Sequence, residues 1–261
     1  MLLELQNVCG GYGSGDVIKG ITCGVDASQI LCLMGPNGCG KTTLFRLLLG
    51  SLPLSGGKIL IDGRDASQLS PKERSRLIAY IPQHHTPVFS YSVLDMVALG
   101  RAPHLGMLQS PGSRDRELAY AALEKVNIVH LADRRYTALS GGQRQLVLIA
   151  RTICQSARIF VMDEPAASLD YANHQLVMDV TRELAKEGYC IVMSTHSLEH
   201  PASAASKILL MSEGRSAAFG APGEILTPEN LEKAYGIEMD VAAVVDRYGV
   251  RRTICLPVRK P

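Results

Sequence analysis

The order of apolar segments in this 261-residue chain predicts an α/β fold. Short apolar runs of strand length alternate with longer segments whose apolar residues recur at helical spacing. A glycine-rich loop at residues 35–42 lies between one such strand and one such helix. Between residues 92 and 155 helical segments replace this alternation, and strands return afterwards. The pattern therefore indicates an α/β domain with a helical block inserted between strands.

The elements follow from this patterning in chain order. Apolar alternation predicts the strands, and apolar spacing of three and four residues predicts the helices. The strand at 29–34 leads directly into the glycine-rich loop and the helix at 41–49. The residues after Tyr235 are expected to form a short tail with a weak strand at 252–256. The other expected strands lie at 2–8, 17–25, 58–62, 77–81, 158–162, 189–194 and 207–211, and the other expected helices at 92–99, 114–127 and 142–155.

Composition and charge exclude several classes of function. A net charge of +2 with scattered Lys and Arg gives no nucleic-acid-binding footprint, so no nucleic-acid partner is expected. The longest apolar runs fall far short of a membrane span, and the first residues lack the features of a signal peptide. The 7 cysteines are an odd number without a C-x-x-C pair. We expect them to be reduced thiols in a cytosolic protein rather than a disulfide or metal framework.

The glycine-rich loop fits the G-x-x-x-x-G-K-[ST] pattern of a phosphate-binding loop. Glycines let successive backbone N–H groups point inward as an anion site, and the N-terminus of the following helix adds its dipole. Lys41 supplies a positive charge to the terminal phosphates, and the Thr42 hydroxyl is placed to coordinate Mg²⁺. The residues expected to hold the nucleotide here are Gly35, Pro36, Asn37, Gly38, Cys39, Gly40, Lys41, Thr42 and Thr43.

Two further motifs follow downstream. The apolar strand at 158–162 is followed by Asp163 and Glu164, which fit a metal ligand and a general base for an attacking water. Residues 139–143 read Leu-Ser-Gly-Gly-Gln, in which a serine and two glycine N–H groups precede a helix and form a second anion site. The nucleotide contacts expected in this segment are Ser140, Gly141, Gly142 and Gln143.

With these motifs, the chain resembles the nucleotide-binding subunit of an ATP-binding cassette (ABC) transporter. The resemblance implies ATP and Mg²⁺ as cofactors and a RecA-like P-loop core with an antiparallel β subdomain and an inserted helical subdomain. It covers residues 2–236, with the core at about 1–84 and 158–236, the helical subdomain at about 85–157 and a short extension at 237–261. Two chains would meet head to tail, so that each ATP lies between one phosphate loop and the partner's LSGGQ segment.

The resemblance also assigns roles to isolated residues. Gln83 would sense Mg²⁺ and the γ-phosphate, and His196 would contact the γ-phosphate as the switch histidine. Asp163 would hold Mg²⁺ through water. Tyr12 would stack on adenine, and Asp170 lies in the segment that matches the family's D-loop.

The segment 91–104 resembles the V-x-D-x-V-x-x-G-R-x-P-H run of importer cassettes for iron–siderophore, haem and vitamin B12, some of which serve molybdate or tungstate instead. It implies two copies of a transmembrane permease as partners, and indirectly a periplasmic or surface substrate-binding protein. It also implies a peripheral position on the cytoplasmic face of a bacterial or archaeal membrane. A soluble, non-transport ABC ATPase is the distant alternative. A partner helix is expected to dock along 83–104, where Val88, Phe89 and Tyr91 either receive it or pack on the helical subdomain.

Competing interpretations accompany three of these segments. Cys39 is expected to contribute through its backbone, and the alternative is a redox-active thiol whose pKa the helix N-terminus lowers. The pair His84 and His85 is not expected to be a metal site. Residues 196–200 fit H-x-x-E-H, a zinc-peptidase pattern, but Pro201 follows at once and no third ligand stands out downstream.

Overall fold

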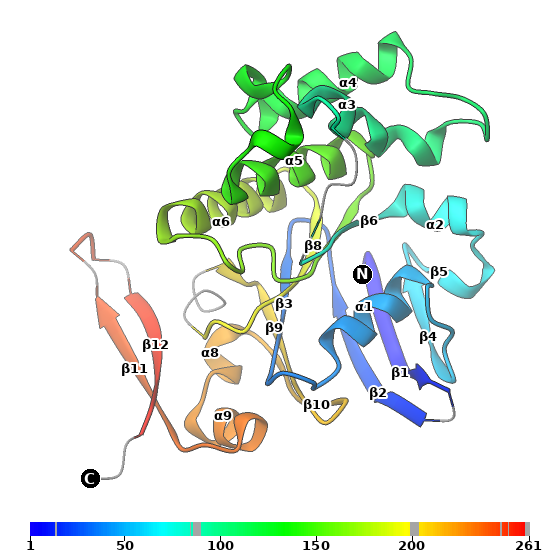
Figure 1. Cartoon of the computed structure of the whole chain (residues 1–261). Helices are drawn as coiled ribbons and strands as arrows, with labels where there is room; N and C mark the ends of the chain where they lie inside the picture. Colours follow the sequence, from blue (N-terminus) through cyan, green and yellow to red (C-terminus); the bar gives the residue numbers. More distant parts are fainter. Residues whose placement is uncertain are drawn as a thin grey trace.

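The computed structural model describes residues 1–13, 15–83, 85, 90–198, 204–245, 247–249 and 251–258, without the side chains of 251 and 252. Within these residues the chain forms a six-stranded sheet, a four-stranded sheet and a two-stranded hairpin. Figure 1 shows the two larger sheets with α1 beside them, the helices α3 to α6 above them, and the hairpin to one side. The residues named above that lie outside the described set are His84, Val88, Phe89, Glu199, His200 and Pro201.

The six-stranded sheet has the order β10-β9-β3-β8-β7-β6 and is parallel except for β10 at its edge. Every residue of β3, β7 and β8 is buried, because elements cover both faces of the sheet. These strands therefore read as unbroken apolar runs in the sequence. The bounds are β3 Ile30–Met34, β6 Ile78–Ile81, β7 Ile159–Met162, β8 Cys190–Ser194, β9 Lys207–Ser212 and β10 Arg215–Gly220.

The four-stranded sheet is antiparallel, has the order β2-β1-β4-β5, and packs across α1 from one face of the central sheet. Leu44 and Phe45 of α1 share one apolar cluster with residues of both sheets, such as Leu5 and Leu33. This packing fixes the N-terminus of α1 between the two sheets. The bounds are β1 Leu3–Tyr12, β2 Gly15–Val25, α1 Lys41–Leu49, β4 Gly56–Ile61 and β5 Arg64–Asp65.

The inserted helices pack on one another and on the opposite face of the central sheet. A single apolar cluster runs from Met34 and Met162 of the sheet through α5 to Leu123 of α4. The bounds are α3 Val93–Ala98, η2 Leu99–His104, α4 Ser113–Lys125, η3 Val129–Leu131, η4 Tyr136–Ala138, α5 Gly141–Cys154 and α6 Tyr171–Lys186. The predicted fold class is therefore confirmed, with helices at the predicted insertion.

Several parts of the fold differ from the sequence-based expectation, including α6 and β10, which were not expected. The strand expected at 77–81 begins at Ile78, and the helix α2, Pro71–Leu77, precedes it. This helix has no buried residue, so it lacks an apolar period, and a capping box between Ser70 and Glu73 defines its start. The short 3₁₀ turn η1, Ala66–Gln68, comes just before it.

The segment after β10 is more ordered than the predicted tail. Two short helices, α8 Pro222–Ile225 and α9 Pro228–Tyr235, lead into an antiparallel hairpin of β11 Met239–Val245 and β12 Arg251–Pro257. The predicted weak strand is β12, and its partner β11 was not expected. Met239 and Cys255 at the base of the hairpin are buried in the central apolar cluster.

Candidate nucleotide site

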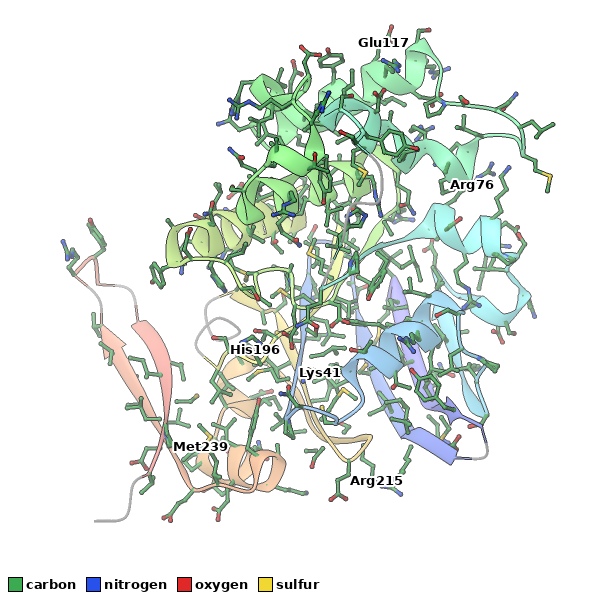
Figure 2. All side chains as sticks on the ribbon, viewed as in Figure 1. Lys41, Arg76, Glu117, His196, Arg215 and Met239 are labelled. Carbon is green, nitrogen blue, oxygen red and sulfur yellow. The ribbon has the colours of Figure 1, made fainter. Side chains whose placement is uncertain are left out.

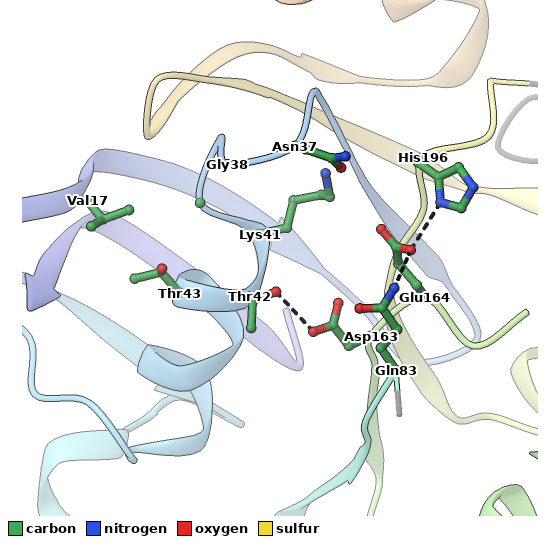
Figure 3. A pocket seen from close by; sticks show the side chains of 11 residues that line it. Val17, Asn37, Gly38, Lys41, Thr42, Thr43, Gln83, Asp163, Glu164 and His196 are labelled. Carbon is green, nitrogen blue, oxygen red and sulfur yellow. Dashed lines mark hydrogen bonds and ion pairs between the residues drawn. The ribbon is translucent and has the colours of Figure 1, made fainter. Parts of the chain in front are cut away.

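A cavity of about 560 Å³ lies at the carboxyl ends of β3, β7 and β8, where the glycine-rich loop begins. Ligands of open α/β sheets bind at this edge, because the strands end there and the loops diverge. Figure 3 shows the lining side chains facing one another from the loop, α1 and the ends of the strands. The lining residues are Val17, Asn37, Gly38, Gly40, Lys41, Thr42, Thr43, Gln83, Asp163, Glu164 and His196.

The glycine-rich loop is already shaped for an anion. Gly35 has a φ of 142°, and a Cβ there would lie 2.2 Å from the carbonyl oxygen of Met211, so a side chain cannot be accommodated. Gly40, with a φ of 108°, precedes α1 without a side-chain cap, which leaves the first N–H groups of the helix to a ligand. Lys41 Nζ donates to the carbonyl oxygens of Gly35 at 2.7 Å and Pro36 at 3.2 Å. The ammonium group is therefore held inside the loop.

Asp163 lies in a site whose donor set fits Mg²⁺. Its Oδ2 accepts from Thr42 Oγ1 at 3.1 Å, and its Oδ1 accepts from Ser194 Oγ at 2.6 Å. The Asp163 backbone N–H donates to Ile81 of the neighbouring strand β6 at 2.9 Å. Carboxylate and hydroxyl oxygens are the hard ligands that Mg²⁺ prefers, and Asp163 is only 5% exposed.

Glu164 joins three elements at the cavity wall. Its backbone has a φ of 46°, a left-handed conformation that non-glycine residues rarely adopt outside functional sites and turns. Its N–H donates to Ser194 Oγ at 2.8 Å. Its Oε2 accepts from Gln83 Nε2 at 2.9 Å and faces His196 Nδ1 at 3.1 Å. The three residues expected to act on the γ-phosphate therefore meet at one carboxylate oxygen.

Tyr12 is not among the residues that line this cavity. Its ring is 48% exposed at the end of β1, and its hydroxyl accepts from Arg46 Nη1 at 2.8 Å. The Arg46 guanidinium carbon is 5.7 Å from the ring centroid, within range of a cation–π contact. An exposed ring fixed by a helix residue is compatible with a platform for a base.

The LSGGQ segment lies at the start of α5, away from the cavity. Ser140 Oγ accepts from the Gln143 N–H at 3.3 Å, and the Ser140 N–H donates to Gln143 Oε1 at 3.1 Å. A Cβ at Gly142 would lie 2.3 Å from Asn173 Oδ1, so the segment packs closely against α6. Asp170 caps α6 by accepting from the Asn173 N–H at 2.8 Å, which lowers the pKa of the Asp170 carboxyl. Neither segment lines the cavity of its own chain.

Several expectations can be set against this geometry. Burial raises the pKa of the Cys39 thiol, with Lys41 opposing the effect, so the premise of a redox-active thiol with a lowered pKa is wrong. His85 Nδ1 lies 3.3 Å from the Tyr136 hydroxyl, and among the described residues no group of three His, Cys, Asp or Glu side chains could hold a metal. The 7 cysteines are all unpaired.

Three residues at the site or next to its members were not predicted from the sequence, and one of them, Val17, lines the cavity. Ser194 connects Asp163 and Glu164, and Arg46 holds Tyr12. A serine at the end of a strand predicts no contact by itself, because its neighbour depends on the order of strands in the sheet. Arg46 lies one turn of helix beyond Thr42 and Thr43, and that spacing could have placed it on the same face of α1.

Fold and site define a protein of the P-loop nucleotide-hydrolase class. Comparison with known proteins narrows this class, since the profile of the family described as ABC transporter matches residues 18–167. An ABC transporter ATP-binding protein of Haemophilus influenzae is 42% identical over 90% of this chain and 89% of its own length. The hemin import ATP-binding protein of Myxococcus xanthus is 33% identical over 92% of each chain. The molybdate import ATP-binding protein of Haemophilus influenzae is 38% identical over 82% of this chain and 80% of its own.

A solved structure is also similar to this chain and supports the same family. An inward-facing, putative metal-chelate type ABC transporter includes a chain that is 33% identical, with a TM-score of 0.88 over 99% of this chain and 98% of its own. This chain belongs to the ABC transporter family as an ATP-binding subunit. It binds ATP and is an ATPase coupled to transport. ATP-binding subunits of importers work as dimers with transmembrane permease partners and are peripheral to the membrane. Across the described residues, no helix has the length and apolar character needed to span a bilayer.

Proposed function

We propose that this chain hydrolyses ATP to energise import of a metal chelate, of the iron–siderophore, haem or cobalamin class, across the cytoplasmic membrane. The observation that carries the hydrolytic part is the convergence of Gln83 and His196 on Glu164 beside Asp163. The hemin-import relative and the metal-chelate transporter support the cargo class. The molybdate-import relative favours an oxyanion, molybdate or tungstate, as the second candidate.

In this proposal, different residues bind the phosphates, hold the metal ion and activate the attacking water. The N–H groups from Gly38 to Thr42 and the Lys41 ammonium hold the phosphates in the loop. Mg²⁺, when bound, would neutralise phosphate charge, and Thr42 and Asp163 are the residues that would hold it, Asp163 through water. Glu164 accepts the proton of the attacking water, because its Oε2 is fixed at the cavity wall. Gln83 and His196 orient that carboxylate and contact the γ-phosphate.

The site is completed by a second copy of the chain. Ser140, Gly141, Gly142 and Gln143 do not line their own cavity, so they would meet the nucleotide of the partner subunit head to tail. Asp170 and the D-loop pack against the same segment through Asn173 and would approach the partner with it. Each dimer would then contain two composite sites.

The permease is proposed to dock in a groove of about 460 Å³ between the core, about 1–84 and 158–236, and the helical subdomain, about 85–157. Leu99 and Tyr80 line it, and Arg76 Nε donates to the carbonyl oxygen of Pro103, another lining residue, at 3.0 Å. Burial and the nearby Asp163 carboxylate raise the pKa of Tyr80 to about 12. Tyr91, the one described residue of the expected apolar docking set, is 40% exposed.

A substitution in this groove tests the transport role separately from ATP binding. Leu99→Glu places a charge in the groove and should abolish copurification with the permease subunit of the transporter, while ATP affinity of the isolated subunit stays within about twofold. Leu118→Glu is the matched control, because Leu118 is 38% exposed on α4 and Leu99 is 39% exposed. Normal assembly of the Leu99 variant would rule out this groove. Uptake of labelled haem, ferric siderophore, cobalamin and molybdate by the intact transporter then decides the cargo.

A further inference from the structure

The hairpin of β11 and β12 is anchored at one end and projects from the domain at the other. Met239 is 3% exposed and Cys255 is 7% exposed, and both pack in the central apolar cluster. The strands pair in register from Met239 opposite Pro257 to Val245 opposite Arg251. Figures 1 and 2 show Met239 near α9 and the rest of the hairpin extending away from the sheets. The base is therefore fixed to the domain, and the rest of the hairpin extends from it.

The hairpin carries exposed apolar residues. Val244 is 47% exposed and Val245 is 64% exposed at the far end of β11, and Leu256 on β12 is 54% exposed near the base. A two-stranded ribbon is marginally stable in water, and exposed apolar side chains on it are a cost unless something covers them. In the described chain, the hairpin is a sheet of two strands with no third strand beside it. Its outer backbone groups can therefore pair with another chain.

The two outer edges are not equivalent. β12 carries adjacent arginines, Arg251 and Arg252, and ends at Pro257, which are the features that protect an edge from pairing. β11 has the sequence Met-Asp-Val-Ala-Ala-Val-Val, with one charge, no proline and small residues at its centre. If two β11 strands pair antiparallel about Ala242 and Ala243, Asp240 faces Val245 rather than another Asp240. The β11 edge is thus the edge suited to a copy of itself.

The position of the hairpin favours a second copy over the permease. Arg76, at the rim of the proposed permease groove, and Met239 lie on opposite sides of the molecule in Figure 2. The hairpin is instead continuous with the nucleotide side, because Tyr235 at the end of α9 has Gly35, Cys39 and Cys255 as neighbours. The partner subunit must approach that same phosphate loop. A two-fold axis brings identical edges together, which an antiparallel pair satisfies.

We infer that the β11 edge pairs with the β11 edge of a second copy of this chain in the ATP-bound dimer, which joins the two hairpins into one four-stranded antiparallel sheet. This inference rests on the proposed head-to-tail dimer. It gives the subunits a contact that is separate from the two nucleotide sandwiches.

Cysteine cross-linking tests the pairing in the full chain. Ala242→Cys and Ala243→Cys are combined with Glu164→Gln, mixed, saturated with Mg²⁺ and ATP, and oxidised. Paired strands place opposite Cα atoms about 4.5–5.5 Å apart, within disulfide range, so covalent dimers should form rapidly and in an ATP-dependent manner. A dimer that forms with ATP but never cross-links through these positions overturns the inference.

A charge substitution provides the second measurement. Val245→Glu should raise the dimer dissociation constant measured by sedimentation with ATP by about tenfold, because it places a like charge opposite Asp240 of the partner subunit at each end of the pairing. Val245→Lys, which places an opposite charge at the same position, is the matched control and should leave the dissociation constant unchanged or lower it. Equal dissociation constants for both variants and the parent would overturn the pairing, as would loss of permease binding with an unchanged dimer. If the parent chain itself forms no dimer with ATP, the proposed composite site fails together with this inference.

Discussion

Two helices of this chain begin at glycine-rich segments, and their N-termini differ in how the first backbone N–H groups are satisfied. α1 follows Gly40, which offers no side chain to cap it. α5 follows Ser140, which forms a reciprocal capping box with Gln143. Because a capped N–H is already satisfied, the α5 terminus has fewer donors to offer than the α1 terminus.

The surroundings of the two helix N-termini differ as well, and they also favour anion binding at α1. Lys41 is 7% exposed and lines the cavity, whereas Gly141 is exposed and lies outside it. One terminus is thus a nearly complete phosphate site within a single chain, and the other is a surface that needs a partner. The comparison shows that glycine content alone does not define an anion site, and that unsatisfied donors and nearby positive charge do.

The largest expected effect comes from replacing Glu164, the proposed general base in the part of the site that a single chain forms. Glu164→Gln should lower the ATP hydrolysis rate by about 10²–10⁴-fold, because the attacking water loses its proton acceptor, while ATP binding is preserved and an ATP-bound dimer accumulates. Steady-state phosphate release and nucleotide binding measure the two outcomes. Glu213→Gln is the control, since Glu213 is exposed with a φ of 48°, close to the 46° of Glu164. Hydrolysis at the parent rate would show that Glu164 is not the base.

The second prediction tests whether the two termini act between chains. Lys41→Ala and Ser140→Arg should each abolish most ATPase activity, because they damage opposite halves of the same composite site. After equal mixing, half of the dimers contain one intact and one doubly damaged site, so activity should return to about a quarter of the parent value if one site suffices. Full activity of either single variant would contradict the shared site.

The smallest expected effect is on ATP affinity, when the contact of Arg46 with Tyr12 is removed. Arg46→Leu removes the 2.8 Å hydrogen bond and the cation that hold the ring, so the dissociation constant for ATP should rise about three- to tenfold with little change in kcat. Binding of tripolyphosphate, which has no base, should be unchanged, and Arg46→Lys should recover part of the loss. If Tyr12→Ala weakens ATP binding but Arg46→Leu does not, the ring needs no support from α1.

The fold class and the ingredients of the site could be predicted because they depend on local sequence. The helix bounds 41–49 match α1, since a phosphate loop must be followed by a helix that starts at its lysine. The role of Ser194 could not be predicted, because it depends on the parallel pairing of β8 with β7. That pairing places the Ser194 hydroxyl next to Asp163 and Glu164. α2 could not be predicted either, because Leu77 is its one large apolar residue and its sequence therefore carries no apolar period.

The close packing at Gly142 changes how mutational data on the LSGGQ segment should be interpreted. Any side chain at Gly142 would collide with Asn173, 2.3 Å from its Cβ, whether or not a nucleotide is present. A saturation scan would therefore record this position as intolerant even in an assay that reports only folding. Asn173→Gly should relieve that intolerance if it has a steric origin. Intolerance that persists in the Asn173→Gly background would identify the contribution that belongs to nucleotide recognition alone.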